Sequence, residues 1–200
     1  PMEVMQKTLQ VIRKADPEFK VSLAGNFHKE LEADIYDYCI PIGASYPAEV
    51  LARRAQNNLP TTYYTCCTEA FPNTFTFSDP AEAAWMSYYS AKDHLDGYLR
   101  WAYNSWPKEP LLDSRFEAWA GGDTYLVYPG ARSSIRFEKL IEGVQAHEKI
   151  TILRKEFTDK KNKTGFKKLE KMLSTFNLRD FPEVPAAETV NKANKILNSL

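Results

Sequence analysis

The sequence lacks net charge, because 26 Lys and Arg residues balance 26 Asp and Glu residues. This balance excludes a global field of either sign, so no nucleic acid or anionic membrane is indicated as a general partner. No run of about 18 apolar residues occurs, so the sequence predicts no membrane-spanning segment. It also opens without a signal-peptide pattern. Since the chain begins at Pro1, we expect a processed or truncated start.

Cysteine is scarce, and the motifs that hold common cofactors are missing. The three cysteines, Cys39, Cys66 and Cys67, are an odd number and lie in apolar, strand-like runs. We interpret them as buried thiols and not as a disulfide framework. Their spacing fits no metal site, and there is no phosphate loop, GxGxxG, HExxH or GxSxG motif. No cofactor and no metal ion are therefore expected.

An alternation of helical and strand patterns fills the first two thirds of the chain. The length of 200 residues, with 44% apolar and 26% charged residues, is typical of one globular domain. Helices are predicted at about residues 2–15, 48–56, 80–94 and 134–155, and strands at 19–23, 35–40, 61–67 and 97–103. Strands that alternate with helices indicate parallel βαβ units, and hence an α/β fold.

The fourth predicted strand, 97–103, ends in an aromatic and amide cluster. Pro107 stops the pairing, and ligands of βα sheets sit at the carboxyl ends of strands. Tyr103, Asn104 and Trp106 are therefore candidate ligand contacts. Flat rings stack on the C–H face of a sugar, while an amide hydrogen-bonds its hydroxyls. For Trp101 alone a core position is the better interpretation, since large aromatics are mostly buried.

The loop 105–132 is long and rich in aromatic residues, and such loops usually carry function. Asp123 follows Gly121-Gly122, a turn where the backbone can approach closely.

Three other residues are weaker candidates for catalysis. Glu69 could be a general acid or base, but a solvated loop carboxylate is the better interpretation. His28 fits a cap or a surface position equally well, and Cys66 has an apolar setting that disfavours a nucleophile.

The C-terminal part is helical, with predicted helices at 166–176 and 186–200. We predict two regions: βα units at 1–157 and a helical extension at 158–200. The basic run 154–171 also contains Glu156, Asp159 and Glu170. A solvated helical face explains that run better than a nucleic-acid patch.

Several aromatic motifs occur in one order along the chain. They are Tyr98-Leu99-Arg100-Trp101-Ala102-Tyr103-Asn104-Ser105-Trp106, Asp113-Ser114-Arg115-Phe116, Gly122-Asp123-Thr124-Tyr125, Val127-Tyr128-Pro129-Gly130 and Arg132-Ser133-Ser134-Ile135-Arg136-Phe137-Glu138. Upstream, Thr65-Cys66-Cys67 and Pro72-Asn73-Thr74-Phe75 fit the same pattern. Together they resemble the carboxyl-terminal half of the catalytic domain of glycoside hydrolase family 123, over most of residues 1–152.

The resemblance implies a (β/α)8 barrel that acts on β-linked N-acetylgalactosamine by a substrate-assisted, retaining mechanism. In that mechanism an Asp orients the 2-acetamido group of the sugar, and an adjacent Glu protonates the leaving oxygen. No Asp-Glu dipeptide occurs in this chain. We expect the pair to precede Pro1, so that the chain is the second half of a TIM-type barrel, strands five to eight, followed by C-terminal helices. The resemblance also implies a secreted, periplasmic or cell-surface protein of a bacterium.

Two functions follow from this expectation. In the first, the chain supplies the sugar-binding wall of a glycosidase but no catalytic residue, with these contacts: Tyr64, Trp101, Tyr103, Asn104, Trp106, Asp123 and Tyr125. In the second, it is a non-catalytic carbohydrate-binding or structural module. A cysteine-dependent enzyme that uses Cys66 is a poorer third. A half-barrel has open edges, so we expect a second copy, the missing half or the C-terminal helices to cover it.

Overall fold

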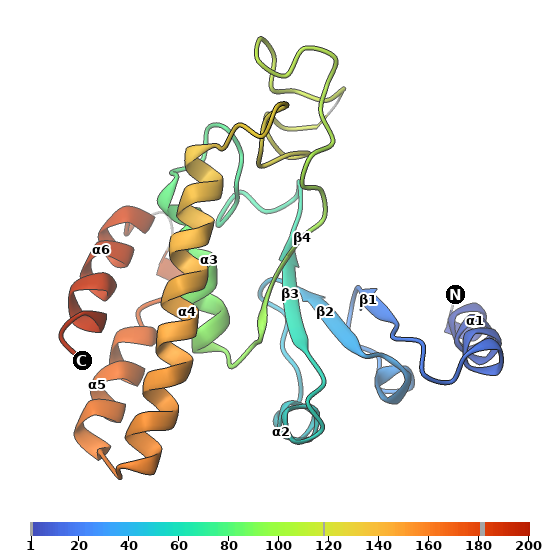
Figure 1. The fold of residues 1–200 in the computed structure, drawn as a ribbon, viewed down its shortest axis with the longest axis horizontal. Coiled ribbons are helices and arrows are strands. Elements are labelled where there is room, and N and C mark those ends of the chain that lie inside the picture. Colours follow the sequence, from blue (N-terminus) through green and yellow to red (C-terminus); the bar gives the residue numbers. More distant parts are fainter. Residues whose placement is uncertain (1, 118, 181–182) are drawn as a thin grey trace. The chain divides into compact units, whose positions relative to one another are not determined.

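The computed structural model describes residues 2–117, 119–180 and 183–200, which form two compact units. Unit 1 is Pro1–Tyr64 and unit 2 is Thr65–Leu200. Figure 1 shows the chain from its N-terminal helix to its C-terminal helices. None of the helices in the described ranges is both long and apolar enough to span a membrane.

Unit 1 holds the first βα repeats. Its elements are α1 (Met2–Ala15), β1 (Ser22–Ala24), the 3-10 turn η1 (Glu32–Asp34), β2 (Asp37–Pro41), α2 (Ala48–Gln56) and β3 (Thr61–Thr65), whose last residue belongs to unit 2. β1 pairs in parallel with β2, with Leu23 opposite Tyr38, and β2 pairs in parallel with β3, with Ile40 opposite Tyr63. Both helices match the predicted ranges, whereas the strands are shorter or shifted by two or three residues.

Unit 2 continues the repeat and then becomes helical. Its elements are α3 (Ala81–Lys92), β4 (Gly97–Arg100), α4 (Ile135–Asp159), α5 (Lys163–Leu173), the 3-10 turn η2 (Leu178–Asp180) and α6 (Ala186–Leu197). The sheet order is β1-β2-β3-β4. The predicted fold class is thus confirmed: parallel βα units of the half-barrel type, followed by C-terminal helices. The division at 157/158 stays a prediction.

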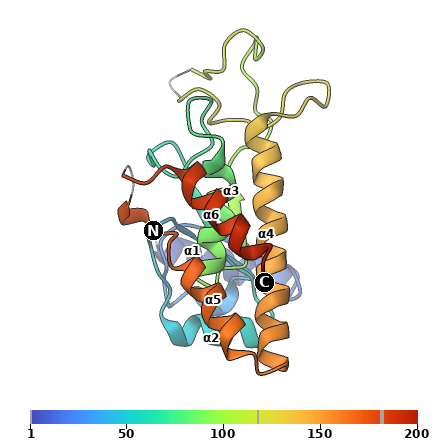
Figure 2. The ribbon, with the colours of Figure 1, turned by 90° about the vertical axis from the view of Figure 1, so that its left-hand side faces the viewer.

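Helix α3 is the centre of unit 2. Figure 2 shows it among α4, α5 and α6, and every residue from Ala81 to Ala91 is buried. The ring of Tyr88 stacks on Phe176 at 4.6 Å, and Trp85 stacks on Tyr89 at 5.5 Å. Alanine and serine between these rings let neighbouring helices approach closely, so the C-terminal helices and α3 share one core.

The ends of the C-terminal helices show what the sequence patterns miss. Ser134 caps α4, because its hydroxyl accepts from the Phe137 amide at 3.2 Å. α5 begins at Lys163, three residues earlier than predicted. The side chain of Asn162 accepts from the Gly165 amide at 2.9 Å. This cap closes the turn within the three residues 160–162, so α4 and α5 form a tight hairpin.

Replacing Gly143 by Ala should destabilise the α3–α4 packing. A Cβ there would lie 2.8 Å from Ala84 Cα and from Ser87 Oγ. Backbone cannot yield as a flexible side chain can, so we expect a loss of about 1–3 kcal/mol of unfolding free energy in urea. The control is Gly25→Ala, where a Cβ meets nothing within 4 Å. Equal midpoints of urea unfolding for the two variants would contradict this close packing of α3 on α4.

Candidate functional site

The candidate site begins where β4 ends. The strand stops at Arg100 and does not reach Tyr103, so the predicted range 97–103 is too long. A short antiparallel pairing, in which the amide of Leu126 donates to the Tyr103 carbonyl at 2.8 Å, takes the chain out of the sheet. Trp101 is consequently 44% exposed. The interpretation of Trp101 as a core residue is wrong, because the strand ends before it.

A buried ion pair lies directly behind Trp101. Arg100 Nη2 donates to Asp123 Oδ1 at 2.7 Å, with 5% of the arginine side chain and none of the aspartate side chain exposed. Trp101 Nε1 donates to the same oxygen at 3.3 Å. Within the described part of the chain, the other carboxylate oxygen of Asp123 has no hydrogen-bond partner. Asp123 thus fixes the indole while remaining out of contact with solvent.

Trp119 stands beside Trp101 on the exposed side. The two rings are tilted by 48°, with centroids 5.4 Å apart, and Trp119 is 40% exposed. Trp119 belongs to the aromatic-rich loop 105–132 but is not among the contacts predicted from sequence. Two exposed indoles in contact form a surface wide enough for one face of a sugar ring.

The other exposed candidates are each anchored separately. Tyr103 packs edge-to-face on Phe137 of α4, with ring centroids 5.7 Å apart. Trp106 Nε1 donates to the Val127 carbonyl at 2.7 Å. Asn104 is exposed, and its backbone bridges to Tyr125. The loop therefore holds these three side chains at defined places on the surface.

Tyr125 is fully buried, so it cannot touch a ligand in this structure. Burial raises its pKa to about 12. Its ring lies 5.6 Å from the guanidinium of Arg136, which also donates to the carbonyls of Gly122, at 2.9 Å, and Thr74. Gly122 has a φ of 78°, and a Cβ there would lie 2.6 Å from Arg136 Nη1. The close backbone approach predicted for the glycine pair is confirmed at Gly122.

Asn73 ties the site to α3, and sequence reasoning missed it. Its side-chain amide donates to the carbonyls of Cys66 and Glu69, at 2.7 Å each, and its carbonyl oxygen accepts from Arg100 at 3.2 Å. Its backbone amide donates to the buried carboxylate of Glu82 at 2.8 Å. Burial raises the pKa of Glu82. The only sequence signal was the Pro72-Asn73-Thr74-Phe75 motif, which carried no predicted role.

The weaker catalytic candidates of unit 2 lie in the turn after β3. Burial raises the pKa of Glu69, but hydrogen bonds from the Cys66 amide, at 2.6 Å, and from Thr68, at 2.8 Å, lower it by more. An ionised Glu69 at neutral pH cannot donate a proton. Cys66 is half-buried and Cys67 is exposed, because β3 ends at Thr65. The prediction of buried thiols holds for Cys39 alone.

Tyr64 and His28 belong to unit 1. Tyr64 lies near the carboxyl end of β3 and is half-buried, with its neighbour Tyr63 buried on the opposite face of the strand. His28 lies in the loop after β1 and is also half-buried. Their roles in binding or catalysis stay predictions.

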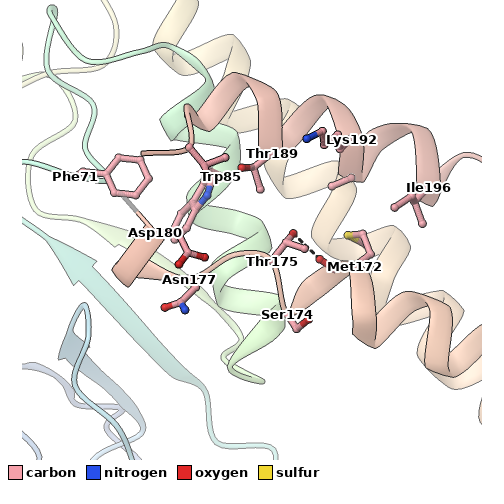
Figure 3. A pocket seen from close by; sticks show the side chains of 12 residues that line it. Phe71, Trp85, Met172, Ser174, Thr175, Asn177, Asp180, Thr189, Lys192 and Ile196 are labelled. Atoms are coloured by element: carbon pink, nitrogen blue, oxygen red, sulfur yellow. Dashed lines mark hydrogen bonds between the residues drawn. The ribbon is translucent and has the colours of Figure 1, made fainter. Parts of the chain in front are cut away.

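A cavity of about 480 Å³ lies between α5, η2 and α6. Figure 3 shows its mixed lining, with Phe71 and Trp85 on one side and the polar groups of Asp180, Asn177 and Lys192 around it. Trp85 is only 3% exposed, because its ring packs against other side chains of the core, such as Tyr89. This cavity is therefore not an aromatic platform like the one at Trp101.

No cluster of three or more metal-ligating side chains occurs in residues 2–117, 119–180 and 183–200.

The sequence matches a known protein family over most of its length. The model of the glycoside hydrolase 123 catalytic domain matches residues 1–153. The chain belongs to this family.

Solved structures agree with the family 123 assignment. Twelve chains match, among them a family 123 glycoside hydrolase from Clostridium perfringens whose structural analysis addresses the details of glycolipid glycan hydrolysis. It is 25% identical, with a TM-score of 0.78. The match covers 100% of this chain but 39% of that one, so the chain spans well under half of its relative. No curated protein matches.

The exposed side chains of unit 2 have the chemistry that a sugar-binding surface needs. Exposed rings and the exposed amide of Asn104 can stack on and hydrogen-bond a sugar. Asp123 is engaged with Arg100, and Glu69 is held ionised. The site thus offers a surface for a glycan without a poised proton donor among these groups.

Proposed function

We propose that this chain forms the substrate-binding wall of a glycoside hydrolase acting on β-linked N-acetylhexosamine glycans of the N-acetylgalactosamine type. The observation that carries the proposal is the exposed Trp101–Trp119 pair, held from behind by the buried Arg100–Asp123 ion pair. A preset aromatic platform binds a sugar face at little entropic cost.

The wall divides into contacts and supports. The contacts are the exposed side chains Trp101, Trp119, Tyr103, Asn104 and Trp106. Asp123 and Tyr125 are supports, because both are buried and act through Trp101, Arg100 or Arg136. Tyr64 stays a predicted contact from unit 1.

Trp101→Ala should weaken binding of methyl N-acetyl-β-galactosaminide by about five- to tenfold, since one stacking ring contributes on the order of 1 kcal/mol. Isothermal titration calorimetry measures the change. Phe19→Ala removes an aromatic side chain that is 55% exposed in unit 1, and it should leave the affinity unchanged. Equal affinities of wild type and Trp101→Ala would remove the platform from the proposal.

We further propose that these 200 residues bind but do not cleave. Asp123 is paired and Glu69 has a lowered pKa, and the sequence holds no Asp-Glu pair. An aryl N-acetyl-β-galactosaminide should therefore hydrolyse at the spontaneous rate in the presence of the chain. If the chain hydrolysed this substrate above the spontaneous rate, and if Glu69→Gln abolished that activity, the proposal that the chain lacks an acid catalyst would be contradicted.

A non-catalytic carbohydrate-binding or structural module is the second candidate, favoured by the same lack of an Asp-Glu pair. Both candidate functions predict that this chain binds or supports without cleaving. They differ in whether the whole protein is catalytic. An Asp-Glu pair encoded upstream of Pro1 would favour the glycosidase, and its absence there would favour the module.

A further inference from the structure

The hairpin between α4 and α5 carries an excess of positive charge. Residues 154–171 contain eight basic and three acidic side chains. Each acid is already paired: Glu156 with Lys160, Asp159 with Lys155, and Glu170 with Arg154. Five lysines of this segment make no ion pair within the described part of the chain: Lys161, Lys163, Lys167, Lys168 and Lys171. The segment therefore carries an excess of positive charge that its own ion pairs do not cancel.

Most of these lysines lie at or near the α4–α5 turn. Three of them, Lys161, Lys163 and Lys167, line a groove of about 420 Å³ at the α4–α5 turn. Lys163, Lys167 and Lys171 are spaced by four residues, which puts them on one face of α5. Figures 1 and 2 both show the turn at one end of the helices of unit 2. The positive amino end of the α5 dipole points the same way.

An apolar side chain stands within the basic cluster. Phe166 lines the same groove and is 37% exposed, whereas Phe157 beneath it is 5% exposed. Lysines around an exposed phenylalanine are the combination that binds a membrane interface, where the ring enters the headgroup boundary and the ammonium groups meet anionic lipid. A sulfated or otherwise polyanionic glycan would use the lysines but has no need of Phe166.

We propose that the α4–α5 hairpin is a contact surface for an anionic lipid bilayer. The proposal does not depend on the sugar-binding function, since Asp123 and the exposed tryptophans take no part in it. It requires only peripheral attachment, by Phe166 and the unpaired lysines.

Co-sedimentation of the full chain with vesicles tests the proposal. Vesicles of phosphatidylcholine with about 30% phosphatidylserine should bind the chain at about 0.1 M salt, and vesicles of phosphatidylcholine alone should not. The triple variant Lys161→Gln, Lys163→Gln, Lys167→Gln should bind about a hundredfold more weakly, on the basis of about fivefold per lysine. Phe166→Ala should bind several-fold more weakly with the same salt dependence.

The matched control is Lys7→Gln, Lys14→Gln, Lys20→Gln, which changes the net charge equally within unit 1. It should bind as the wild type does. Circular dichroism of each variant shows that it is folded. No binding to anionic vesicles, or an equal loss in the control, would overturn the proposal. Binding to heparin without binding to vesicles would also overturn it, in favour of a polyanionic glycan.

Discussion

Replacing Asp123 by Asn should lower the unfolding free energy by about 3–5 kcal/mol, because the change leaves Arg100 buried with an uncompensated charge. The two side chains are 0% and 5% exposed, so water cannot take the place of the carboxylate. Trp101 loses a charged acceptor at 3.3 Å as well. Sugar affinity should therefore fall together with stability. Urea unfolding measures the loss of stability, and isothermal titration calorimetry on the folded variant measures the loss of affinity.

The matched control is Asp113→Asn, in the same loop. Asp113 pairs with Arg115 at the surface, where the two side chains are 49% and 73% exposed, so no measurable loss is expected. Arg100→Met should cost less in the Asp123→Asn background than in wild type, since the two residues act as one pair. Additive effects, or a wild-type midpoint for Asp123→Asn, would contradict the buried ion pair.

Replacing Arg54 by Met should destabilise unit 1 by a similar amount, about 3–5 kcal/mol. Arg54 is fully buried in α2. It donates to Glu32 Oε1 at 3.2 Å, and to the carbonyls of Tyr36 and Pro60 at 2.7 Å each. Methionine fills the volume but leaves these acceptors unsatisfied, so chemical denaturation should show an early loss of unit 1.

Arg53→Met provides the comparison, because Arg53 pairs with the same Glu32 but its side chain is 50% exposed. We expect a loss below about 1 kcal/mol there. A larger loss for Arg53→Met than for Arg54→Met would show that the buried guanidinium does not hold β2 and α2 together.

The helices and the order of the elements could be predicted from sequence. Proline at the start of α2, serine before α4 and regular apolar spacing are local signals, and local signals set helix ends. Strand ends depend on partners elsewhere in the chain. β4 reads as a strand to Tyr103, but pairing with Leu126 ends it at Arg100. Nothing within 97–103 encodes that partner.

The candidate site could be predicted only as a region. The aromatic and glycine motifs located Trp101 and Asp123, whose direct contact joins residues far apart in sequence. Exposure was harder to predict: Trp101 is exposed and Tyr125 buried, although both follow β-favouring patterns. Trp119 gains its role from a ring contact with Trp101, and Asn73 from hydrogen bonds to groups that include Arg100. Such contacts arise from tertiary packing and leave no local pattern.

The four tryptophans of the chain allow the central claim to be tested in one measurement. A ¹⁵N–¹H correlation spectrum resolves each indole N–H while methyl N-acetyl-β-galactosaminide is added. If the exposed loop is a sugar-binding wall, the signals of Trp101 and Trp119 shift saturably, and the signal of the buried Trp85 stays in place. Unchanged signals of Trp101 and Trp119 at saturating sugar, or a shift of Trp85 alone, would contradict the account.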